Sequence, residues 1–187
     1  MDDRLRRTSK FLSYVLRHDP DALGLALDPG GWVEVETLVE RARVDGRPLS
    51  RARIEQVIEA GEKTRFALSD DGSRIRANYG HSVEVDLALS PTPPPGTLYH
   101  GTARAAVSAI RAEGLRPQSR QYVHLSPTPD EATAVGRRHG TPVVLSIDAP
   151  ALHEAGQALY RSTDTVWLTR RVPPDFIRCP ESSLPGS

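Results

Sequence analysis

The spacing of apolar residues predicts short elements and two halves of different character. In the first half, apolar side chains recur three and four positions apart, the period of a helix with one buried face. Residues 5–16 follow this period and predict a first helix, with Thr8 or Ser9 as its cap. The helix should end near His18, because Pro20 disfavours helical geometry in the residue before it.

The rest of the first half predicts alternating helices and short strands. The expected elements are a turn at residues 30–31, a strand at 32–35, a helix at 36–43, a helix that begins after Ser50, and strands at 64–69 and 74–79. The sequence Asp70-Asp71-Gly72 predicts the turn of the closing hairpin. Helix, strand, helix, helix and hairpin is the order of a winged-helix-like lobe, although a fold alone does not define a function.

The second half predicts a small split β-sheet with interspersed helices, an α+β lobe. Strands are expected at residues 97–100, 122–125, 141–147 and 165–168, and helices at 105–113 and 129–138. Four prolines in residues 90–96 predict a stiff linker. The predicted domains are therefore residues 1–90, a linker at 91–96, a second lobe at 97–180, and a disordered tail at 181–187.

Composition excludes several classes of protein. Cys179 is the only cysteine of the 187 residues, so neither a disulfide framework nor a multi-cysteine zinc site is expected. No run of 18 apolar residues occurs and the N-terminus is charged, which favours a soluble, cytoplasmic protein with no membrane partner. The 24 basic and 24 acidic residues balance, and all but Lys10 and Lys63 of the basic residues are arginine. A GC-rich genome accounts for most of these arginines, but a few converging on one phosphate would bind it through forked hydrogen bonds.

Four clusters could carry chemistry, and each has an ordinary structural explanation. Arg17-His18 also suits the negative end of a helix dipole. In Arg65-Phe66, strand alternation makes Phe66 a core residue and turns Arg65 to solvent or to a partner. Residues 76–82 include a Gly-His-Ser turn that could contact a ligand or simply close a hairpin. Two short strands end in His100 and His124, without the spacing of a metal site.

Together with several further segments, these clusters resemble the RNA (tRNA) 2′-phosphotransferase family. The segments that carry the resemblance are residues 9–18, Gly31-Trp32, Arg65-Phe66, 76–82, 99–102, 120–126, 135–140 and 166–169. They occur in the family's order from about Ser9 to Phe176, with the proline-rich break where the family changes lobes. Two positions depart from the family pattern: Tyr79 stands where glutamine is usual, and Gln121 stands where histidine is frequent.

The resemblance implies a fold, a reaction and a set of residues. Members pair a winged-helix-like RNA lobe with a lobe similar to ADP-ribosyltransferases. They transfer an internal RNA 2′-phosphate to the co-substrate NAD through an ADP-ribosylated RNA. The products are 2′-OH RNA, nicotinamide and ADP-ribose 1″,2″-cyclic phosphate. The implied catalytic residues are Arg17, His18, Arg65 and Arg120, and the implied NAD-binding residues are His100, Gly101, Thr102, Ser126, His124, His81 and Arg138. No metal is expected, and a monomer is favoured.

Two other classes of function remain open from the residues. An ADP-ribosyltransferase that caps terminal phosphates of nucleic acid would use the same pocket and stop after the first step. A non-catalytic winged-helix nucleic-acid-binding protein needs a basic recognition helix, whereas the helix after Ser50 carries Glu55, Glu59 and Glu62. A protein-modifying toxin is disfavoured by the absence of an acidic Glu-x-Glu pair in the second lobe.

Overall fold

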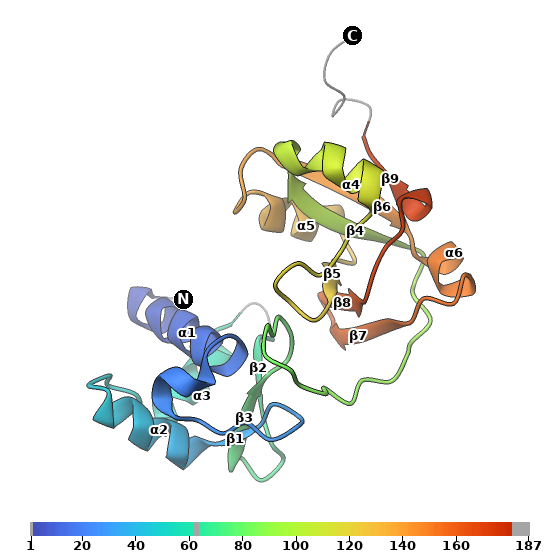
Figure 1. The fold of residues 1–187 in the computed structure, drawn as a ribbon. Coiled ribbons are helices and arrows are strands. Elements are labelled where there is room, and N and C mark those ends of the chain that lie inside the picture. The colour runs from blue at the N-terminus through green and yellow to red at the C-terminus, as the bar shows by residue number, and fades with distance from the viewer. Residues whose placement is uncertain (1, 62–63, 181–187) are drawn as a thin grey trace. The chain divides into compact units, whose positions relative to one another are not determined.

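The chain folds into two compact units, divided between Ala88 and Leu89 (Figure 1). The computed structural model describes residues 2–61 and 64–180, so the tail predicted at 181–187 lies outside the described residues. Each unit has its own hydrophobic core. Within the described residues, no helix combines the length and apolar character needed to span a bilayer.

The first unit packs three helices against a three-stranded antiparallel sheet of order β1-β3-β2. Its elements are α1 (Asp3–Arg17), the 3₁₀ helix η1 (Pro20–Leu23), β1 (Val33–Glu34), α2 (Val35–Val44), α3 (Arg51–Glu59), β2 (Phe66–Leu68) and β3 (Arg74–Ala77). The predicted order of helices and strands is therefore correct. Phe66 is 3% exposed and belongs to the core, as the strand pattern predicts.

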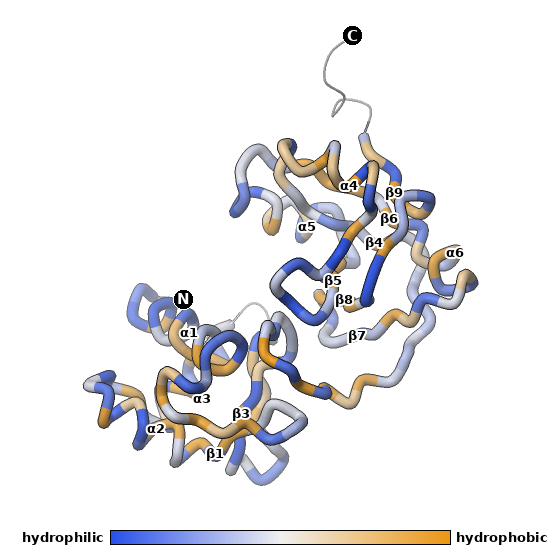
Figure 2. The backbone as a smooth tube through the Cα atoms, viewed as in Figure 1, coloured by the Kyte–Doolittle hydropathy of each residue, from blue (hydrophilic) through white to orange (hydrophobic). Residues whose placement is uncertain are grey.

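Helix α1 begins earlier than predicted. Asp2 caps it, because its carboxylate accepts a hydrogen bond from the backbone N–H of Leu5 at 2.7 Å. Thr8 lies inside the helix, where its hydroxyl donates to the Arg4 carbonyl. The prediction of Thr8 or Ser9 as cap is therefore wrong, since the first turns of α1 are hydrophilic (Figure 2) and Leu5 is the only apolar side chain among residues 3–10 that marks their buried face. The helix ends at Arg17, as expected.

The second unit contains two three-stranded antiparallel sheets, ordered β4-β6-β9 and β5-β8-β7. Its elements are β4 (Thr97–Ala103), η2 (Arg104–Ala106), α4 (Val107–Glu113), β5 (Val123–Leu125), α5 (Pro129–Gly136), β6 (Pro142–Asp148), α6 (Ala149–Glu154), β7 (Leu159–Thr163), β8 (Val166–Thr169), η3 (Pro174–Phe176) and β9 (Ile177–Arg178). Reciprocal backbone hydrogen bonds between Tyr99 and Ser126, at 2.7 and 2.8 Å, join the two sheets. The α+β class and the small sheets are confirmed.

The proline-rich segment lies just after the division between the units and is attached to the second one. Pro91 pairs with Tyr160 of β7, and the backbone N–H of Thr92 donates to the Leu159 carbonyl at 2.8 Å. Part of the predicted linker thus lies along the edge of a sheet. Proline is tolerated at such an edge because it has no N–H to contribute to a ladder.

Candidate functional site

In the first unit, the segment after β3 folds back onto the C-terminal end of α1. The backbone N–H groups of Ser82 and Val83 donate to the Arg17 carbonyl at 2.9 and 3.3 Å, and so satisfy a carbonyl that the helix leaves unpaired. Gly80, at a φ of +89°, makes the bend, and a Cβ there would lie 3.4 Å from the Arg17 Nη1. Two clusters distant in sequence are thereby brought together.

The Arg17 guanidinium is held between aromatic rings. Its central carbon lies 4.9 Å from the ring centre of Tyr79 and 5.7 Å from that of Phe66. Its Nη2 also donates to the Arg65 carbonyl at 3.4 Å. Tyr79, the departure from the family pattern, therefore has a definite contact here. Arg17 is a pre-positioned cation.

His18 and Arg65 lie beside Arg17 on the first unit. The His18 Nδ1 is 2.9 Å from the Ser82 hydroxyl, which fixes one side of the exposed imidazole. Arg65 precedes β2 and is half-buried, and no carboxylate pairs with its guanidinium in the described part of the chain. Arg17, His18 and Arg65 form what we call the anion cluster, which has the cations and the imidazole needed to bind a phosphate and move a proton.

His81 is a buried neighbour of this cluster. It is 2% exposed, and burial, followed by the nearby Arg17, His18 and Arg76 charges, lowers its pKa to about 4. Its Nε2 lies 3.6 Å from the position a Cβ would take on Gly31, whose φ of +78° favours glycine. A side chain so enclosed does not present its imidazole to a ligand in this structure. The expectation that His81 contacts NAD stays a prediction.

Arg120, the fourth implied catalytic residue, belongs to the second unit, where it lines a cavity of about 540 Å³. The lining residues that sequence analysis also selected are His100, Gly101, Arg120 and His124. Thr102 and Ser126 are buried, and neither they nor Arg138 line the cavity. His139, next to Arg138 in sequence, does line it, although it was not predicted as a site residue. Alternation along the chain does not distinguish His139 from Arg138, because both follow the end of α5.

Backbone carbonyl groups fix the tautomers of two histidines of this cavity, His100 and His124. The Nδ1 of His100 lies 3.0 Å from the His124 carbonyl, and the Nδ1 of His124 lies 3.0 Å from the Tyr122 carbonyl. A carbonyl only accepts, so each Nδ1 carries the proton. Burial, more than any neighbouring charge, lowers the pKa of His100. His100 is therefore neutral near pH 7, and its Nε2 is an acceptor suited to a hydroxyl group.

The cavity has the size and the lining of a small-molecule binding site. Ligand cavities in proteins span about 300–1,000 Å³ and combine apolar walls with a few polar groups. Here Arg120 offers a cation, His100 a hydrogen-bond acceptor, and Tyr122 an aromatic ring. Position 101 requires glycine for packing, because a Cβ there would lie 1.7 Å from the Ala132 carbonyl oxygen of α5. Among the described residues, no three metal-ligating side chains are grouped.

An anion cluster of arginines and a histidine, together with a cavity of small-molecule size, suits a transferase that acts on a phosphorylated substrate. Comparison with known proteins identifies the group. Residues 3–171 match the family described as RNA 2′-phosphotransferase, Tpt1 / KptA family, and the chain belongs to that family. The resemblance inferred from the sequence is confirmed.

Similar proteins of known sequence carry the same name in several bacteria. A probable RNA 2′-phosphotransferase of Pseudomonas aeruginosa is 53% identical over 172 residues, covering 91% of this chain and 94% of that protein. The one from Nostoc punctiforme is 49% identical over 177 residues, with 95% and 98% covered. The one from Hahella chejuensis is 47% identical over 186 residues and covers 100% of both chains.

Proposed function

We propose that this protein removes an internal 2′-phosphate from RNA by transferring it to NAD. The products would be 2′-OH RNA, nicotinamide and ADP-ribose 1″,2″-cyclic phosphate. The observation that carries the proposal is the anion cluster, in a chain that belongs to the RNA 2′-phosphotransferase family. NAD, as co-substrate, supplies the ribose whose C1″ accepts the phosphate as nicotinamide leaves.

The arginines serve as a phosphate clamp. A 2′-phosphate is already an anion near pH 7, so its attack needs no general base, and the barrier lies in positioning and desolvation. Tyr79, Phe66 and the Arg65 carbonyl already hold Arg17 in place, so the side chain loses little conformational freedom when it binds the phosphate. Arg65 would add forked hydrogen bonds to the non-bridging oxygens, where charge accumulates during transfer. Arg120 of the second unit keeps the catalytic role that the family pattern implies.

His18 is proposed to move the proton in the second step. When the ribose 2″-OH displaces the RNA 2′-oxygen, that hydroxyl loses a proton and the departing oxygen gains one. An imidazole ordinarily titrates near pH 6.5 and can do either. The Ser82 hydroxyl would hold the ring in one orientation. In a His18→Ala variant, ADP-ribosylated RNA should accumulate; slower formation of that species with no accumulation would contradict the assignment.

The cavity of the second unit is proposed to bind NAD. Neutral His100 would accept a hydrogen bond from a ribose hydroxyl through Nε2. Gly101 lines the cavity. Thr102, within β4, and Ser126, which joins the two sheets, would shape the site indirectly. A His100→Ala variant should therefore raise the KM for NAD more than the KM for RNA.

The test is to incubate the protein with NAD and an RNA that bears one internal 2′-phosphate, and to separate all products. The wild type should release 2′-OH RNA and cyclic phosphate, and Arg65→Ala and Arg120→Ala should lose at least about a hundredfold in rate. Arg161→Ala is a matched control, because Arg161 is exposed and pairs only with the surface residue Asp164 in the described structure. Persistent ADP-ribosylated RNA from the wild type would instead favour the capping reaction.

A further inference from the structure

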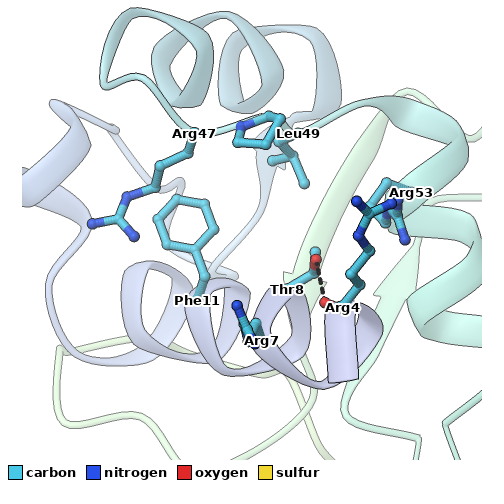
Figure 3. Close-up of a pocket in the computed structure, with 8 residues that line it drawn as sticks. Arg4, Arg7, Thr8, Phe11, Arg47, Leu49 and Arg53 are labelled. Carbon is cyan, nitrogen blue, oxygen red and sulfur yellow. Dashed lines mark hydrogen bonds between the residues drawn. The ribbon is translucent and has the colours of Figure 1, made fainter. Parts of the chain in front are cut away.

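A groove on the first unit, away from the anion cluster, has arginines as half of its lining residues (Figure 3). It has a volume of about 490 Å³ and lies between the N-terminal half of α1, the start of α3 and the segment before it. Its lining residues are Arg4, Arg7, Thr8, Phe11, Arg47, Pro48, Leu49 and Arg53. Figure 3 shows Arg47 with Phe11 at one end and Arg4 with Arg53 at the other.

The groove has four cationic lining residues and no acidic one. Arg47 is partly neutralised, since it pairs with Asp45 at 2.7 Å and covers the Phe11 ring at 4.7 Å. Arg4 and Arg7 are exposed, and neither pairs with a carboxylate among residues 2–61 and 64–180. Arg6, between them, is different because it pairs with Asp3 at 3.0 Å.

These charges oppose the stability of α1. The N-terminal end of a helix carries partial positive charge, so cations there are unfavourable by a few tenths of a kcal/mol. Arg4 and Arg7 occupy its first two turns, next to Arg53 across the groove. Asp2 and Asp3 offset part of this positive charge. Residues that oppose local stability are nevertheless concentrated at binding sites. The groove is therefore suited to an anion supplied from outside the chain.

The helical period connects the groove to the anion cluster. Arg4, Arg7 and Phe11 lie three and four positions apart, and the same stripe continues through Tyr14 to His18 at the end of α1. With a rise of about 1.5 Å per residue, Arg4 and His18 are about 20 Å apart along the axis. Tyr14, 49% exposed, supplies an aromatic surface between them. Cations with interleaved aromatic rings are typical of single-stranded nucleic-acid tracks.

We propose that this groove binds backbone phosphates of the RNA substrate, several nucleotides from the 2′-phosphate. The proposal rests on the proposed function, because it takes RNA as the substrate and His18 as the site of reaction. At about 3.4 Å of rise per nucleotide in a stacked strand, 20 Å corresponds to about six nucleotides. A long substrate therefore reaches the groove, whereas a 2′-phosphorylated dinucleotide does not. Contacts to phosphate position the strand without reading its sequence.

The test compares two double variants of α1. Arg4→Ala/Arg7→Ala removes two charges from the groove, and Arg6→Ala/Lys10→Ala removes two from the same helix outside it. The probe is a fluorescently labelled single-stranded RNA without a 2′-phosphate, whose affinity is followed by anisotropy at several salt concentrations. The groove variant should lose about tenfold in affinity at low salt, and the slope of log K against log salt should shrink by about 1.4.

The control separates binding from folding. Alanine is the best helix former, so neither double variant should lower the thermal midpoint, and the groove variant should keep or slightly raise it. Equal losses of RNA affinity in both double variants would mean that the affinity depends on the total positive charge of the helix and not on the groove, and would overturn the proposal. So would an unchanged affinity and salt slope in the groove variant.

A kinetic measurement distinguishes this proposal from the proposed function. For a substrate with about ten nucleotides on each side of the 2′-phosphate, kcat/KM of the groove variant should fall about tenfold, whereas for a 2′-phosphorylated dinucleotide it should not change. If the wild type turns over neither substrate, the proposed function is wrong. The anisotropy measurement then tests RNA binding in the groove by itself. If the wild type turns over both substrates and the groove variant loses kcat/KM equally for both, the groove proposal is wrong and the proposed function stands.

Discussion

At the scale of single residues, the anion cluster depends on neighbours that fix its orientation. The Arg17 guanidinium lies against aromatic rings, and the His18 imidazole lies within hydrogen-bond distance of the Ser82 hydroxyl. The sequence alone indicates Arg17, His18 and Arg65 as a set only through the family pattern, because each has an ordinary structural explanation. Ser82 enters the site for a reason that sequence spacing does not reveal, namely that its segment caps the end of α1.

Ser82 should act as a positioning residue for His18. Its hydroxyl lies 2.9 Å from the His18 Nδ1, so Ser82→Ala should lower kcat about three- to tenfold by freeing the imidazole. The KM for NAD should stay unchanged. Ser82→Thr keeps the hydroxyl and should restore most of the rate in the same steady-state assay. A loss in both variants would indicate a structural role for the serine instead.

His81 should make the first unit sensitive to acid. Burial lowers its pKa to about 4, whereas the unfolded chain binds the proton near its ordinary value of 6.5. As pH falls from 6.5 to 4, the unfolded state takes up a proton that the folded state refuses, so stability falls by up to about 3 kcal/mol. Urea unfolding of the wild type at several pH values measures this loss.

The matched variant is His81→Gln, which cannot titrate in this range. It should be less stable than the wild type at pH 7.5, because a buried side chain is replaced, but its stability should change less between pH 6.5 and 4. Parallel pH profiles for the two proteins would contradict the assignment to His81.

At the scale of elements, periodic patterns predict the helices and central strands well, and weak patterns fail. The buried faces of α1 and α3 repeat at three and four residues, and Ser50 caps α3 through a hydrogen bond to the Arg53 N–H. Helix α6 and strand β7 went unpredicted. α6 has only six residues, and a register shift between Arg161 and Thr163 interrupts the alternation in β7.

Gly101 should be required for the packing of α5 on β4. A Cβ there would lie 1.7 Å from a backbone carbonyl oxygen of α5, which cannot move without displacing the helix. Gly101→Ala should therefore lower the melting temperature by at least about 5 °C, as expected for overpacking in a domain of this size. Ala134→Ser, on the exposed side of α5, should leave it unchanged. Equal melting temperatures for Gly101→Ala and the wild type would contradict this packing.

At the scale of the whole molecule, the candidate chemistry is divided between two units with separate cores. The first carries the anion cluster and the arginine-lined groove, and the second carries the cavity proposed for NAD. The division and the α+β class follow from changes of pattern along the chain. The winged-helix-like and ADP-ribosyltransferase-like character of the two units stays a prediction. The groove was missed because its arginines lie in three separate segments that only folding brings together.

The most direct measurement follows the phosphate itself. An RNA whose single internal 2′-phosphate carries an isotopic label is incubated with the protein and NAD, and the label is located among the products. We predict that the label leaves the RNA and appears in ADP-ribose 1″,2″-cyclic phosphate, one equivalent for each nicotinamide released, and that nothing is released without NAD. Label released as inorganic phosphate, or retained on an ADP-ribosylated RNA, would contradict transfer of the phosphate to NAD.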